Sequence, residues 1–178
     1  MNKQNVTFCP FLWRIASVHT ITYFIAGVLA SYLFHYKESF ETGELSCLMR
    51  PFDSPMIMVG PVLQPLRGIL FSLVLWPFRS VILEQRRGWF YLWILFLGLA
   101  ILGTCGPSPG SVEGMIYTKL PVLDQIIGLR ETVFQTLLFS LLFFYWWKYP
   151  RKIWNILSII LLALILFMML AGLLASGI

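Results

Sequence analysis

The stretch from Ile153 to Ser176 contains no charged residue and is long enough to cross a membrane as one helix. A bilayer core about 30 Å thick needs about 20 consecutive apolar residues in helical form. The composition agrees, because 58% of the residues are apolar and 12% are charged, with a mean hydropathy of +0.80. Soluble domains carry about 25% charged residues. The sequence therefore predicts an integral membrane protein.

Four further apolar stretches precede this one. We predict an all-α, polytopic transmembrane helical bundle that forms a single integral membrane domain, 1–178, without internal repeats or a separate soluble domain. Apolar runs of suitable length place the five spans at about 15–36, 65–83, 88–105, 131–147 and 153–176.

Pro61 and Pro65 interrupt the apolar region before the second span. A proline inside a helix removes a backbone hydrogen bond and clashes with the preceding turn. We therefore predict that about 55–63 forms a half-helix or re-entrant segment and that the second span begins at Pro65. Broken backbone at membrane depth must be buried in protein or line a water-filled cavity.

The basic residues divide unevenly between the two sides of the predicted bundle. Lysine and arginine collect in loops on the cytoplasmic side of a membrane protein. The sequence thus predicts a multi-pass protein of the inner membrane with a cytoplasmic N-terminus and an extracytoplasmic C-terminus. The richer side holds Lys3, Arg14, Arg79, Arg86, Arg87, Lys148, Arg151 and Lys152, and the poorer side holds Lys37, Arg50, Lys119 and Arg130.

Arg67 is the basic residue that fits neither side. The uncharged stretch between it and Arg79 would span only about 16 Å as helix, about half the hydrocarbon thickness. An arginine at such a depth usually faces a bundle interior or a wet cavity and has partners. If Arg67 lies at the start of a helix, the free amide groups there would add to its attraction for an anion. The alternatives are a guanidinium that snorkels to outer phosphates and one that forms a structural ion pair.

Polar residues predicted on the outer side are candidates for a pocket around Arg67. Glu113, Glu131 and Asp53 are the candidate counter-charges. Alternative interpretations remain for each group: Ser111 caps a short helix to about Thr118, Arg50 pairs locally with Asp53, and Glu131 is an interfacial carboxylate. The full set of pocket candidates is Arg67, Glu113, Glu131, Asp53, Arg50, Gln64, Gln135 and Ser111.

The sequence gives little support for the binding of a metal, a cofactor or nucleic acid. The three cysteines form no CxxC pair, and no histidine lies at metal-ligand spacing from them. Cys47 and Cys105 are predicted on the same outer side, where an oxidising compartment would allow a disulfide. His19 is expected to be a packed, hydrogen-bonded residue. The basic residues form no continuous face for nucleic acid.

No motif names a reaction, and the leading hypothesis is a small transport, scaffold or accessory subunit with an outward-facing polar pocket. Its expected partners are membrane lipid and, through small-residue helix faces such as Gly172-x-x-x-Ser176, a second copy or a larger membrane complex. One alternative is a membrane-embedded enzyme acting on a lipid headgroup or another anionic substrate, with Glu113 and Glu131 as an acid–base pair. Another is a haem- or quinone-binding subunit.

Overall fold

The computed structural model describes residues 7–43, 46, 48–52, 54–102 and 106–175. Over these residues the chain forms helices and no strand, which confirms the predicted all-α class. The elements in chain order are α1 (Phe8–Leu33), α2 (Tyr36–Glu41), α3 (Pro55–Leu75), the 3-10 turn η1 (Trp76–Phe78), α4 (Arg79–Glu84), α5 (Gly88–Leu102), α6 (Val112–Tyr117), α7 (Val122–Lys148) and α8 (Lys152–Ala175).

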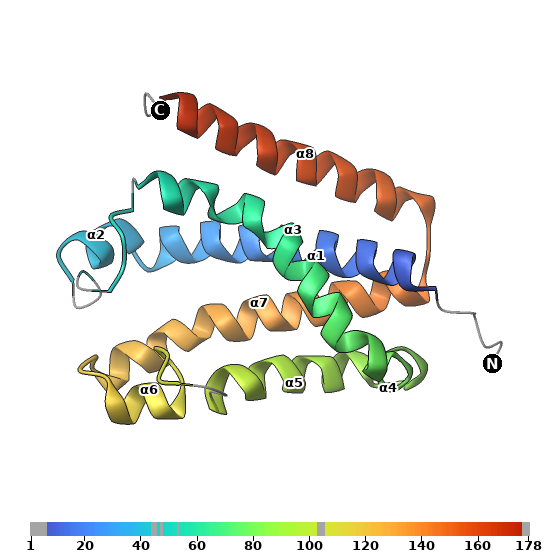
Figure 1. The fold of residues 1–178 in the computed structure, drawn as a ribbon, viewed down its shortest axis with the longest axis horizontal. Coiled ribbons are helices and arrows are strands. Elements are labelled where there is room, and N and C mark those ends of the chain that lie inside the picture. Colours follow the sequence, from blue (N-terminus) through green and yellow to red (C-terminus); the bar gives the residue numbers. More distant parts are fainter. Residues whose placement is uncertain (1–6, 44–45, 47, 53, 103–105, 176–178) are drawn as a thin grey trace.

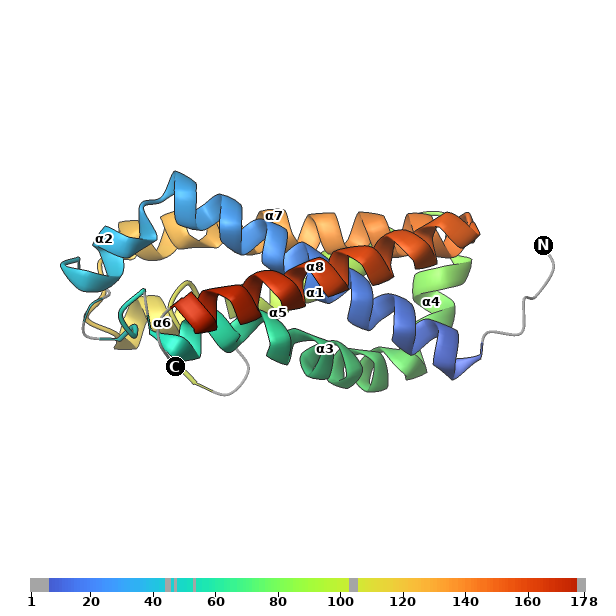
Figure 2. The same cartoon turned by 90° about the horizontal axis from the view of Figure 1, so that it is seen from above.

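Four helical segments of the described chain are long and apolar enough to cross a membrane. They are α1, the continuous run Pro55–Glu84 formed by α3, η1 and α4, α7, and Lys152–Leu174 of α8. The apolar helix α5 is shorter, at 15 residues, or about 22 Å of helical rise. The five segments run in alternating directions, so that α1 begins and α8 ends at opposite ends of the bundle (Figures 1 and 2).

The predicted break before Pro65 is wrong, because α3 is one helix that contains both Pro61 and Pro65. The prolines deprive the Ile57 and Pro61 carbonyls of their usual amide donors, which bends a helix without ending it. Figure 1 shows α3 changing direction along its length. Pro55 occupies the first turn of α3, where a missing amide hydrogen costs nothing.

The apolar core lies at the end of the bundle that carries most of the basic connections. Phe11 and Ile15 of α1, Leu92 of α5 and Phe143 of α7 are fully buried there. Edge-to-face ring contacts, such as Phe11 against Phe143 at 5.6 Å between centroids, link the helices. The Arg14 guanidinium lies 4.6 Å from the Trp147 ring centroid, which keeps a basic side chain against this aromatic cluster.

A close approach of α1 and α3 occupies the middle of the bundle. A Cβ added at Gly68 would lie 2.5 Å from the Cα of Ala16, so the two backbones meet where neither side chain has bulk. One turn earlier on α3, the buried Gln64 accepts a hydrogen bond from Nε2 of the buried His19 at 3.1 Å. His19 is therefore packed and hydrogen-bonded, as expected.

The segment before α7 is held by its own polar groups. Ser111 caps α6 by accepting the Gly114 amide at 2.9 Å, and α6 ends next to Thr118, which confirms the predicted short capped helix. The buried Gln125 accepts the Gly110 amide at 3.1 Å and donates to the Leu120 carbonyl at 3.0 Å. α7 extends nine residues upstream of the predicted fourth membrane segment, because its charged first turns form helix before the apolar stretch begins.

Candidate functional site

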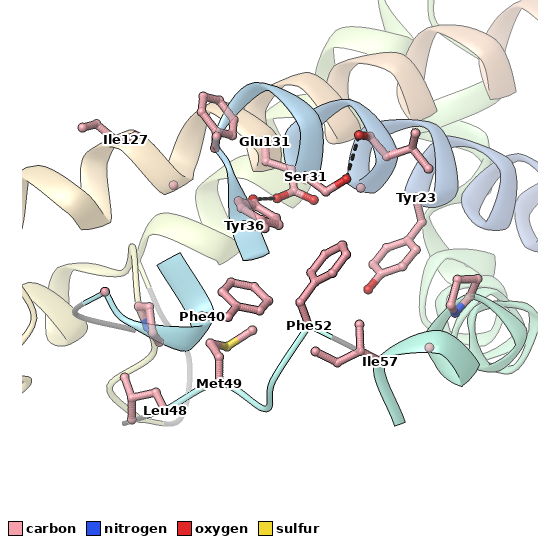
Figure 3. A pocket seen from close by; sticks show the side chains of 18 of the residues that line it. Tyr23, Ser31, Tyr36, Phe40, Leu48, Met49, Phe52, Ile57, Ile127 and Glu131 are labelled. Atoms are coloured by element: carbon pink, nitrogen blue, oxygen red, sulfur yellow. Dashed lines mark hydrogen bonds between the residues drawn. The ribbon is translucent and has the colours of Figure 1, made fainter. Parts of the chain in front are cut away.

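A cavity of about 860 Å³ lies at the end of the bundle opposite the aromatic core. Its walls come from the C-terminal half of α1, from α2, from the first turns of α3 and from the first half of α7, together with the residues that join α2 to α3. Figure 3 shows Tyr23, Tyr36, Phe40, Phe52 and Glu131 around this space. Most of its lining is apolar, which is typical of small-molecule sites.

The turn between α1 and α2 brings a phenol to the cavity wall. His35 has a left-handed backbone, with φ of 49°, and this reverses the chain so that α2 starts at Tyr36. The Tyr36 hydroxyl donates a hydrogen bond to the half-buried Glu131 carboxylate of α7. Burial, followed by the hydrogen bond and the charge of Glu131, raises the pKa of the Tyr36 phenol, so Tyr36 remains a donor at neutral pH.

Three glycines on three different helices keep the cavity open. Gly27 of α1, Gly60 of α3 and Gly128 of α7 all line it, and a Cβ added at any of them would have no heavy atom within 4 Å. Glycine inside a helix costs about 1 kcal/mol relative to alanine. No neighbouring atom requires a glycine at these positions. The feature that the three glycines share is the empty space beside them.

One face of α7 carries the charged groups of the cavity. Asp124, Ile127, Gly128 and Glu131 all line it, at the i, i+3, i+4 and i+7 spacing of a single helical face. Asp124 is exposed in the first turn, whereas Glu131 lies about 10 Å further along the helix and is half-buried. None of the described residues that line the cavity is a lysine or an arginine.

Aromatic rings line the cavity next to this face of α7. Tyr36 and Phe40 stack at 5.1 Å between centroids and 19° between planes, and Phe40 lies 6.3 Å from Phe52. Tyr23 projects its hydroxyl into this region from α1 (Figure 3). The cavity therefore joins aromatic faces to two carboxylates.

Arg67 does not line this cavity. Its side chain is exposed near the middle of the Pro55–Glu84 segment, and its guanidinium lies 5.4 Å from the Phe71 ring centroid. No ion pair joins Arg67 to Glu113 or Glu131 in the described part of the chain.

The other predicted pocket residues lie apart from the cavity or outside the described residues. Gln64 bonds His19, Ser111 caps α6, and Glu113 lies in the first turn of α6. Arg50 is exposed and Gln135 is half-buried, and neither lines the cavity. Asp53, Cys47 and Cys105 lie outside the described residues, and so do the predicted Arg50–Asp53 pair and the predicted disulfide.

Sequence reasoning missed Tyr36 and the three glycines. A signal exists for Gly60, because Gly60, Gln64, Gly68 and Ser72 recur every four residues on α3 and define the face that meets α1 and the cavity. Tyr36 had no such signal, since its role depends on a contact with a residue 95 positions away. No group of described histidine, cysteine and carboxylate side chains is arranged to hold a metal ion.

Comparisons with protein-family models, with curated proteins and with solved structures find no match for this chain. The class of protein follows from the fold and the cavity alone. Its apolar helices fit a multi-pass helical membrane protein, and the cavity at one end of its bundle has the size of a small-molecule site.

Proposed function

We propose that this chain is a small inner-membrane subunit that binds an amphipathic ligand in an outward-facing cavity, in support of transport or of a larger membrane assembly. The observation that carries the proposal is the cavity of about 860 Å³. Small-molecule sites usually measure about 300–1,000 Å³ and are mostly apolar with a few polar groups. Glu131, Tyr36 and Tyr23 supply those groups here.

The outward direction of the cavity is part of the same proposal. The end of the bundle opposite the cavity holds Arg79, Arg86, Arg87, Lys148 and Arg151, which the positive-inside rule assigns to the cytoplasm. The cavity and α2 would then lie at the outer surface of the membrane. A ligand would enter from the outer leaflet or from the extracytoplasmic space.

The test compares small molecules that co-purify with three forms of the protein. Gly27→Leu places a side chain inside the cavity, whereas Gly98→Leu adds the same side chain on α5, where a Cβ also has open space but the cavity is absent. Each form is purified from membranes in a mild detergent, and the extracted molecules are identified by mass spectrometry. We expect the unmodified chain and Gly98→Leu to retain a molecule that Gly27→Leu loses. Identical extracts from all three would end the proposal.

A further inference from the structure

Both charged side chains that line the cavity are acidic, and both belong to α7. Asp124 lies at its exposed rim and Glu131 lies deeper. Within the described residues, the polar partner of Glu131 is the neutral Tyr36 phenol, and no lysine or arginine forms an ion pair with it. A half-buried carboxylate without a counter-charge is costly, because burial removes water that would otherwise solvate it. A ligand with a positive charge would supply the missing counter-charge of Glu131.

The aromatic faces of the cavity suit the same kind of charge. Tyr36, Phe40 and Phe52 surround the space beside Glu131. An organic cation is attracted to the face of an aromatic ring within about 6 Å, and rings combined with a carboxylate are a recurring way to hold an ammonium group. An anion would meet two carboxylates and the negative faces of these rings.

The size and the apolar lining exclude a bare cation as the whole ligand. The cavity is about 860 Å³, and Phe24, Val28, Met56 and Ile57 line the part that α1 and α3 enclose. We infer that the ligand is an amphiphile whose headgroup is an amine or a quaternary ammonium, with this headgroup at Glu131 and its apolar tail against α1 and α3. This inference rests on the binding function proposed above.

The experiment uses three photoreactive probes that share one dodecyl diazirine tail and differ in the headgroup: trimethylammonium, hydroxyl or phosphate. The full chain is placed in phosphatidylglycerol nanodiscs, whose lipids carry no ammonium group. Empty nanodiscs measure how much of each probe enters the bilayer, and labelling is divided by that amount. The labelled peptides are then mapped to show whether the probe reached the cavity walls.

Two pairs of variants test separately the charge of Glu131 and the empty space of the cavity. Glu131→Gln removes the carboxylate and keeps its shape, whereas Glu113→Gln makes the same change at a carboxylate that does not line the cavity. Gly128→Leu places a side chain inside the cavity, where its Cβ meets no heavy atom within 4 Å, and Gly98→Leu is its control on α5. Size-exclusion profiles confirm that each variant is folded.

We expect the trimethylammonium probe to label the cavity peptides about tenfold more than the hydroxyl probe, and the phosphate probe to label them least. Glu131→Gln should reduce that preference severalfold, because only Asp124 and the rings then favour the cation, and Glu113→Gln should preserve it. Equal labelling by all three probes, abolished by Gly128→Leu, would overturn the cationic ligand and leave the binding function standing. No labelling of the cavity peptides above the bilayer background would overturn both.

Discussion

The Tyr36 hydroxyl donates a hydrogen bond to the Glu131 carboxylate, which joins two residues that are 95 positions apart. This contact ties α2 to the inner end of the α7 wall and closes one side of the cavity. It exists because His35, which directly precedes α2, has a left-handed backbone that turns α2 back toward α7. The cavity therefore depends on a local backbone conformation and on a long-range polar contact.

Replacing the phenol tests that contact. Tyr36→Phe should lower the free energy of unfolding by about 2 kcal/mol, since a hydrogen bond to a charged group contributes about 1.5–3 kcal/mol. Thermal unfolding in detergent measures the change. A double-mutant cycle with Glu131→Leu, which leaves no acceptor for the phenol, should give a coupling energy of similar size. Tyr32→Phe is the control, because the Tyr32 side chain is 81% exposed. Independent effects of the two substitutions would contradict the contact.

The turn at His35 gives a second prediction. Histidine tolerates a left-handed backbone better than most residues, and β-branched residues tolerate it poorly. His35→Gly should leave stability and ligand retention unchanged, whereas His35→Val should shift α2 and abolish the coupling between Tyr36 and Glu131. The double-mutant cycle repeated in each background measures this. Similar results for Gly and Val would mean that the positive φ does not position Tyr36.

Much of the fold could be predicted because membrane spans depend on local composition. The charge-free stretch that begins at Ile153 identifies α8 without any knowledge of its neighbours. The proline rule failed at Pro61 and Pro65 for a physical reason. Each proline removes a single backbone hydrogen bond, and helical segments on both sides can keep the chain helical through a bend.

The candidate site was harder to predict because it is made of contacts between distant segments. Arg67 is conspicuous in the sequence because it is a charge in an apolar stretch. The cavity, however, is lined by Gly27, Gly60 and Gly128, which contribute empty space and no side chain. Glu131 was a candidate from its position near the outer end of a span. Its partner Tyr36 could not be inferred, because nothing in the sequence specifies how α2 packs against α7.

Gly68 should tolerate no larger residue, because α1 and α3 meet there. A methyl group at Gly68 would lie 2.5 Å from the Ala16 Cα, so the helices must separate. Overpacking of this kind costs about 1–3 kcal/mol, and Gly68→Ala should lower the unfolding temperature accordingly. Gly98→Ala is the matched control, since its Cβ would enter open space and alanine favours the helix. Equal or higher stability of Gly68→Ala would refute the close approach.

The buried pair His19 and Gln64 predicts an asymmetry between single and double substitutions. Gln64→Leu leaves the His19 Nε2 proton without its 3.1 Å acceptor in an apolar interior, and should cost about 1 kcal/mol. Adding His19→Phe removes the stranded donor and should recover part of that loss. Unfolding measurements on the single and double variants decide the matter. Gln135→Leu is the control, because it removes a half-buried amide from α7 outside this pair.

The orientation of the chain can be tested with single cysteines at its two ends. In a background with Cys9, Cys47 and Cys105 replaced by serine, we substitute Lys119→Cys before α7 or Arg86→Cys between α4 and α5. The excess of basic residues at the Arg86 end predicts that this end faces the cytoplasm. A membrane-impermeant maleimide should therefore label Lys119→Cys in intact cells and label Arg86→Cys only after permeabilisation. The reverse pattern would place the cavity on the cytoplasmic side, and the ligand would then enter from the inner leaflet.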